Sequence, residues 1–182
     1  VAFTIGPLFD ALAPHLAKRR HLGVHSPIFT DALMDLVKSG AVTNRYKGIY
    51  RGRSVTSHAL GSRELFEWLD HNPLVVFLGI DKIYNPVLIG NNPQFIAIMP
   101  ARKVDLSGNI ALHVGKGIVA AGPSEVMDFF NGAQISSGGN CIFALSSRNM
   151  KNESNFHLSV DHFPNRFNLR EAVDMILADI DQ

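Results

Sequence analysis

The 182-residue sequence predicts an α/β domain, built on a mixed, mostly parallel open sheet with helices on both faces. Continuous apolar runs of strand length, such as 74–79 (LVVFLG) and 140–145 (NCIFAL), are typical of strands covered on both sides. Amphipathic segments with helical spacing alternate with these runs along the chain. The length suits one sizeable core, so we expect residues 1–182 to form a single domain.

In the first third of the chain we expect two helices separated by a strand. Pro7 can open a helix, because its missing N–H is not needed in the first turn, and Pro14 should kink that helix or end it early. The apolar run 21–25 (HLGVH) indicates a strand, with Pro27 at the turn that follows it. A helix over 31–39 should come next.

The remaining elements are predicted from hydrophobic periodicity and from capping and turn residues. Ser62 should cap a helix over 63–72, with Leu65, Phe66 and Leu69 on one face. Ser107-Gly108-Asn109 indicates the turn of a hairpin over 104–112. Further strands are expected at 55–60, 94–99 and 156–160, and helical turns at 85–91 and 124–133. The last segment is open between a helix, because Asn168 and Glu171 form a capping-box signature, and a buried strand over 175–178 (MILA).

Composition narrows the function classes. The net charge of +1 gives no sign of the basic clustering that nucleic acids or acidic membranes require. No apolar stretch approaches the roughly 20 residues of a membrane span. Cys141 is the single cysteine, which excludes an internal disulfide and favours a reducing cytoplasm. The sequence opens inside a strand-like run and stops after an apolar run, so we expect a piece of a longer protein.

Residue chemistry alone identifies no site. The histidines are scattered, and His21 and His25 lack a third ligand, so no metal site is predicted. The segment "GKG" at 115–117 lacks the frame of a phosphate loop, and His25-Ser26 lacks the G-x-S-x-G frame of a hydrolase elbow.

The order of several segments carries more information. "HLGVHSPIFTDALMDLVKSGAVTN", "ALGSRELFEWLDHNP", "NPVLIGNNPQFIAI", "VDLSGNI" and "MDFFNGA" follow one another with similar gaps to those of the acetyl-CoA hydrolase/transferase family, which includes 4-hydroxybutyrate and acetate CoA-transferases. The sequence resembles that family's C-terminal CoA-transferase domain over nearly the whole chain. The resemblance implies acyl-CoA or coenzyme A as ligand with no covalently bound cofactor, an N-terminal half of the same fold as partner, and a homodimer.

The family word G-[IV]-H-[ST]-E-M is altered at its reactive position. Its glutamate is the nucleophile, which passes through acyl-anhydride and glutamyl-thioester intermediates. Here the word reads Gly23-Val24-His25-Ser26-Pro27-Ile28, so Pro27 matches the nucleophile. Because covalent catalysis by a carboxylate requires a carboxylate, the family mechanism cannot run from this position.

The family's glycine loop, G-x-G-G-[QS]-x-D-F, is altered as well. Gly122 is kept, Pro123 cannot donate an amide hydrogen bond, and Ser124 and Glu125 replace two glycines. Losing one oxyanion donor typically costs about 10²–10³ in rate. Glu125 is the one carboxylate introduced near the expected site, so it is either a relocated nucleophile or a solvated glutamate at a helix N-terminus.

Three functions follow from these departures. The first is a degenerate CoA-transferase-family domain that retains at most acyl-CoA binding, with His25, Ser26, Gly122 and Ser124 around the ligand. The second is an active acyl-CoA transferase or hydrolase that uses Glu125, a group outside this chain or water activated near His25. The third is a structural or interaction subunit without CoA affinity. His25 and Ser26 could equally close a turn whose φ at Pro27 is fixed.

Overall fold

Helices and strands alternate along the chain, as the apolar pattern predicts. The structure is a computed structural model that describes residues 1–2, 6–113, 126–161, 165–167 and 175–178. The helices are α1 (Pro7–Leu16), α2 (Asp31–Lys38), α3 (Arg63–Leu69), α4 (Ile80–Ile83), α5 (Pro86–Gly90) and α6 (Val126–Ile135). The strands are β1 (Ile28–Phe29), β2 (Ser54–Thr56), β3 (His58–Ala59), β4 (Val75–Phe77), β5 (Ile96–Pro100), β6 (Lys103–Asp105), β7 (Ile110–His113), β8 (Asn140–Leu145), β9 (Phe156–His157), β10 (Asn165–Phe167) and β11 (Met175–Ala178).

Most strand pairs are parallel, and the segments at Val1–Ala2 and His25 connect the two parallel sheets through single bridges. Strands β11, β8 and β5 form one parallel sheet, and β2 and β4 form another. Ala2 bridges to Ala97 of β5 in parallel, and His25 bridges to Val55 of β2. The amide of His25 donates to the carbonyl of Val1 at 3.2 Å, which joins these two bridges. The predicted α/β class with a mostly parallel open sheet is confirmed.

Among the strands that the structure describes, antiparallel pairing occurs at the predicted hairpin and at β10, and one antiparallel bridge joins Arg148 to Ser154. Strands β6 and β7 pair antiparallel, β10 adds to β7, and β9 lies parallel to β6. Asp105 holds this unit together: its carboxylate accepts from the amides of Ser107 (2.9 Å), Asn109 (2.9 Å) and Val160 (3.2 Å). Gly108, with φ 82°, supplies the left-handed residue of the turn.

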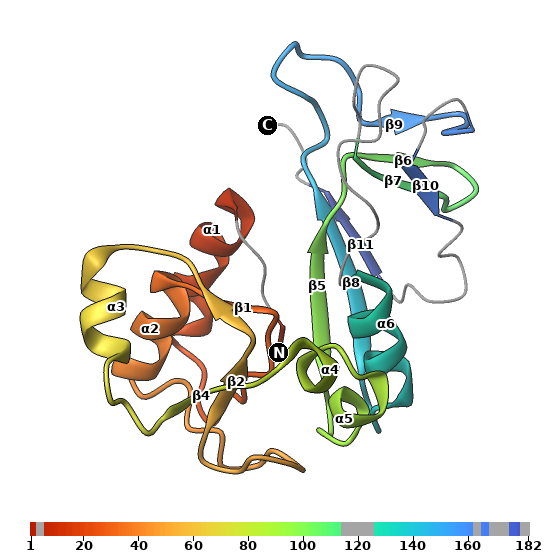
Figure 1. Cartoon of the computed structure of the whole chain (residues 1–182). Helices are drawn as coiled ribbons and strands as arrows, with labels where there is room; N and C mark the ends of the chain where they lie inside the picture. The colour runs from red at the N-terminus through yellow and green to blue at the C-terminus, as the bar shows by residue number, and fades with distance from the viewer. Residues whose placement is uncertain (3–5, 114–125, 162–164, 168–174, 179–182) are drawn as a thin grey trace.

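Two apolar clusters hold the helices in place (Figure 1). Helices α4, α5 and α6 lie beside β5 and β8, whereas α1, α2 and α3 gather around the strands of the first half of the chain. Helix α6 approaches α5 so closely that a Cβ added to Gly132 would lie 2.4 Å from Cγ2 of Ile89. Glycine at this position therefore sets the spacing between the two helices.

The first strand is not where the sequence predicts it. Residues 21–25 make only single bridges, at Leu22 and His25, and His21 has φ 62°. The side chain of Asn44 takes the place of a ladder partner, because its Oδ1 accepts the amide of Val24 at 2.8 Å. The regular strand, β1, follows Pro27 instead of preceding it.

Several other expectations need correction. The strand expected at 55–60 is two strands: β2 pairs with β4, and β3 pairs with β1. Strand β4 is not covered on both faces, because Phe77 is 47% exposed. Phe66 does not share the buried face of Leu65 and is 51% exposed. Of the two outcomes expected at Pro14, a kink or an early end, the early end does not occur, because helix α1 continues to Leu16.

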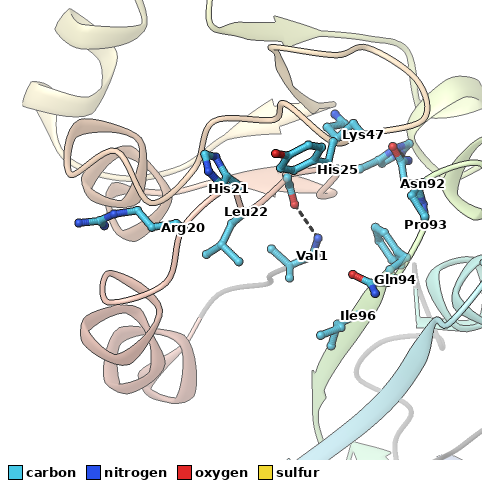
Figure 2. Close-up of a pocket in the computed structure, with 13 residues that line it drawn as sticks. Val1, Arg20, His21, Leu22, His25, Lys47, Asn92, Pro93, Gln94 and Ile96 are labelled. Atoms are coloured by element: carbon cyan, nitrogen blue, oxygen red, sulfur yellow. Dashed lines mark hydrogen bonds between the residues drawn. The ribbon is translucent and has the colours of Figure 1, made fainter.

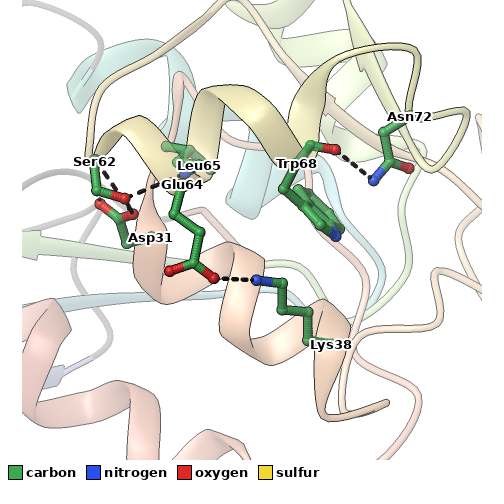
Figure 3. A network of polar contacts seen from close by, with 7 residues as sticks. All are labelled: Asp31, Lys38, Ser62, Glu64, Leu65, Trp68 and Asn72. Atoms are coloured by element: carbon green, nitrogen blue, oxygen red, sulfur yellow. Dashed lines mark hydrogen bonds and ion pairs between the residues drawn. The ribbon is translucent and has the colours of Figure 1, made fainter.

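The expected capping residues lie where the sequence places them. The hydroxyl of Ser62 accepts the amide of Leu65 at 3.2 Å and donates to the carboxylate of Asp31, which connects α3 to the first turn of α2 (Figure 3). An exposed ion pair between Lys38 and Glu64 at 2.8 Å joins the same two helices.

Candidate functional site

The candidate site is the segment around Pro27, between two stretches of parallel backbone. Pro27 is buried and follows the bridge between His25 and Val55. Its carbonyl accepts from Ser57, through the hydroxyl at 2.6 Å and the amide at 3.4 Å. Parallel pairing resumes directly afterwards, with Ile28 opposite His58. Ser57 follows the carboxyl end of β2, and open α/β sheets bind ligands outside such ends.

His25 is a neutral core histidine. Its side chain is 1% exposed and meets the rings of Phe95 and Phe129 edge-on. Nε2 donates to the carbonyl of Ile83 at 2.9 Å, and Nδ1 lies 3.5 Å from Nδ2 of Asn92. Burial lowers the pKa of His25 to about 4 and outweighs the opposing hydrogen bond from Ile83. Both ring nitrogens therefore face protein groups, and the ring carries no charge at neutral pH.

Asn92 links this histidine to the helical layer. Its Nδ2 donates to the carbonyl of Ile89 at 3.2 Å, and its backbone carbonyl accepts the hydroxyl of Ser136 at 2.6 Å. That hydroxyl in turn accepts the amide of Phe95 at 3.0 Å. The segment that leads to Pro27 is thus fixed against α5 and α6 by a buried polar network.

His25 also lines a cavity of about 420 Å³ (Figure 2). Lys47, Asn92, Phe95 and Val1 line it too. The cavity lies at the amino end of β5, because Gln94 and Phe95, which precede that strand, are among its walls. The cavity therefore lies near the amino end of a strand, whereas Ser57 follows the carboxyl end of β2.

Lys47 is an unusual buried cation at this cavity. It is 5% exposed, and its Nζ donates to the carbonyls of Val24 at 2.8 Å and Arg53 at 2.9 Å. Burial lowers its pKa to about 7. Its stem passes so close to Gly23 that a Cβ there would lie 2.8 Å from Cγ of Lys47.

The other predicted site residues do not add to this site: one is part of the sheet, and three lie outside the described residues. Ser26 is fully buried and its amide donates to the carbonyl of Val55 at 3.0 Å, so it belongs to the sheet. Gly122, Ser124 and Glu125 lie outside the described residues. Helix α6 begins at Val126, and burial raises the pKa of Asp128 in its first turn.

Sequence reasoning missed Ser57, Lys47 and Asn92. Lys47 and Asn92 lie in short polar stretches, and Ser57 lies in the segment predicted as a strand over 55–60, and none of these patterns indicates the tertiary partners. Within the described part of the chain, no group of three or more His, Cys, Asp or Glu side chains could hold a metal ion. None of the helices described is long and apolar enough to cross a membrane.

The chain matches known proteins over most of its length. A family model described as the acetyl-CoA hydrolase/transferase C-terminal domain matches residues 61–179, more than half of the chain. A succinyl-CoA:acetate/propanoyl-CoA:succinate CoA transferase of Fasciola hepatica is 34% identical over 152 residues, which are 82% of this chain and 32% of that protein. A 4-hydroxybutyrate coenzyme A transferase of Clostridium kluyveri is 32% identical over 143 residues, 79% of this chain and 33% of that protein.

Solved structures extend the similarity to nearly the whole chain. RipA from Yersinia pestis has a TM-score of 0.86 at 28% identity and covers 97% of this chain and 39% of its own. A 4-hydroxybutyrate CoA-transferase from Porphyromonas gingivalis has a TM-score of 0.83 at 28% identity and covers 97% of this chain and 41% of its own. The chain spans about a third of the length of the curated relatives it matches.

Proposed function

Because the chain belongs to the acetyl-CoA hydrolase/transferase family, we propose that it serves as an acyl-CoA-binding domain that does not transfer CoA through a glutamyl intermediate. The observation that carries this proposal is Pro27, a buried proline at the position of the family nucleophile. The ligand class comes from the relatives, whose names describe CoA transfer between carboxylic acids.

The surroundings of Pro27 support the loss of glutamyl chemistry. A pyrrolidine ring offers no nucleophile, and its carbonyl is already bound by Ser57. Both ring nitrogens of His25 already contact protein groups, the carbonyl of Ile83 and the side-chain amide of Asn92, and its lowered pKa makes it a weak base, which disfavours it as a replacement for the lost carboxylate. The buried network through Asn92 holds the segment in place regardless of whether chemistry occurs there.

The ligand would be held jointly with the rest of a longer protein. The relatives are about three times as long as the matched region, so we propose that an N-terminal half completes the CoA site. Gly122 and Ser124 remain the proposed ligand contacts of this chain, and His25 and Ser26, which are buried, would support the backbone beside the ligand. A homodimer in the cytoplasm is the assembly we propose.

Transfer through a relocated carboxylate is the alternative, and Glu125 is its candidate. That residue precedes α6 directly, where a helix N-terminus would stabilise a negative charge. A Glu125→Gln variant that keeps full activity would remove this route. A subunit without CoA affinity is the third possibility, and only a binding measurement separates it from the proposal.

Calorimetric titration of the full-length protein with acetyl-CoA and free CoA tests the proposal. We expect micromolar binding by the wild type and by Pro27→Glu, with CoA transfer to a short carboxylate only in Pro27→Glu. Pro27→Gln is the matched control, because glutamine has nearly the same shape as glutamate but is not a nucleophile. This variant should bind acyl-CoA without turnover. Absence of heat from the wild type would overturn acyl-CoA binding. Turnover by the wild type, with hydroxylamine-sensitive labelling of a carboxylate, would overturn the loss of glutamyl chemistry.

A further inference from the structure

A serine and a histidine lie in contact next to Pro27. Oγ of Ser57 is 2.8 Å from Nδ1 of His58 and 2.6 Å from the carbonyl oxygen of Pro27. The hydroxyl of Thr56 donates to the carbonyl of His58 at 3.0 Å, which fixes the backbone that carries the imidazole. A serine hydroxyl has one proton, so Pro27 and His58 are two acceptors for the same hydrogen.

This pair lies opposite Pro27, between two stretches of parallel pairing. Ser57 directly follows β2, and His58 begins β3, whose register pairs it with Ile28 of β1. By the same register Ser57 faces Pro27, and the pair follows the carboxyl end of β2, outside which open α/β sheets bind ligands. Ser57 is half-buried, whereas His58 is exposed, so a ligand can reach the pair from solvent.

A partly apolar surface adjoins the pair. A shallow hollow of about 570 Å³ is lined by the apolar residues Ala59, Phe66, Leu69 and Phe77 and by the charged residues Arg63, Glu67 and Asp70. Ala59 follows His58 in the chain, and Phe77 is the register partner of Thr56. Phe66 and Phe77 are about half exposed, at 51% and 47%. An acyl chain with apolar character would find complementary surface there.

We propose that Ser57 and His58 form a nucleophile–base pair that hydrolyses acyl thioesters with an apolar acyl group. The inference rests on the proposed function, since the thioester must first be bound. The distance between Oγ and Nδ1 is within the range for a serine activated by an adjacent base. The carbonyl of Pro27 holds the hydroxyl in place until its proton turns toward the imidazole.

The chemistry balances without a further reactant. Oγ attacks the thioester carbonyl carbon, and its proton passes to Nδ1 of His58. The C–S bond breaks, the thiolate takes that proton and leaves as free CoA, and an ester remains on Ser57. Water then attacks the ester while Nδ1 accepts its proton and returns it to Oγ. The products are a carboxylic acid and the original serine.

Two labelling reactions on the full-length protein test the pair. Hexanoyl-CoA followed by acid quenching should leave an ester that peptide mass spectrometry places on Ser57. A fluorophosphonate, which reacts with activated serines and needs no CoA site, should label the same residue. Neutral hydroxylamine should spare the serine ester, whereas it would cleave a glutamyl thioester.

Variants separate activation from simple packing. Ser57→Ala should abolish both labels, and His58→Gln should slow their formation by roughly 100-fold or more, the usual contribution of a general base. Ser39→Ala is the matched control, because its hydroxyl also donates to a backbone carbonyl, that of Leu36 at 3.1 Å, and it should leave labelling unchanged. Since the label is localised on the wild type, the test does not depend on how well Ser57→Ala folds.

The outcomes distinguish this inference from the proposed function. A protein that binds hexanoyl-CoA in the calorimeter but carries neither label on Ser57 would overturn the serine–histidine pair and leave acyl-CoA binding intact. Fluorophosphonate labelling of Ser57 in a protein that gives no heat with acyl-CoA would support an activated serine and overturn the proposed ligand. A protein with neither heat nor label would overturn both.

Discussion

His25 should make the folded state sensitive to acid. Its side chain is buried against two phenylalanine rings, and burial lowers its pKa from 6.5 to about 4. Between pH 6.5 and pH 4, His25 binds a proton in the unfolded chain but not in the folded chain. The stabilisation is therefore complete above pH 6.5 and is lost as the pH falls toward 4.

The size of the effect follows from the shift in pKa. Each pKa unit corresponds to about 1.4 kcal/mol, and pH 5 lies between the two pKa values, about 1.5 pH units below the higher one. We expect the free energy of unfolding to fall by about 2 kcal/mol between pH 8 and pH 5 through His25 alone. Urea unfolding followed by circular dichroism at several pH values in this range measures it.

His25→Gln isolates the contribution of the imidazole. Glutamine can still donate to the carbonyl of Ile83 but does not titrate, so the variant should lose about 2 kcal/mol less than the wild type over the same range. His21→Gln, at an exposed histidine four residues earlier, controls for the loss of a histidine as such. Parallel curves for wild type and His25→Gln would refute the assignment of His25 as a buried neutral residue.

Three further changes test the fold by urea or thermal unfolding. Gly132→Ala should destabilise by about 1–2 kcal/mol, because overpacking against α5 outweighs the helix propensity of alanine; unchanged stability would mean that the two helices can separate. Asp105→Ala should cost about 2 kcal/mol or more, since the buried amide of Val160 and the more accessible amides of Ser107 and Asn109 lose their acceptor, and a cost below 1 kcal/mol would contradict its bridging role. Ser62→Ala should cost about 1 kcal/mol through the lost cap, whereas Lys38→Ala, at an exposed ion pair, should cost less; the reverse order would refute this assignment.

Much of the fold could be predicted from local pattern. The cap at Ser62, the turn at Gly108 and the strands β5 and β8 follow from residue types whose conformational preferences act over a few neighbours. Local pattern leaves 175–178 open between a helix and a strand, and the structure has the strand β11 there. The family resemblance could be predicted as well, because it depends on the order of words along the chain. The proline at position 27 was visible for the same reason.

The tertiary structure decided the conformation and the surroundings of the residues in those motifs. The strand predicted over 21–25 is replaced by single bridges because the side chain of Asn44, twenty residues away, satisfies the amide of Val24. The sequence by itself leaves His25 open as a pocket residue or a turn residue. Its neutral, buried state comes from Ile83 and Phe129, which lie far along the chain. Ser57 gains significance only because β2 and the segment before β1 lie side by side, which brings its hydroxyl to the carbonyl of Pro27. Local preferences fix turns and caps, whereas burial and polar partners depend on contacts that form only when distant segments pack together.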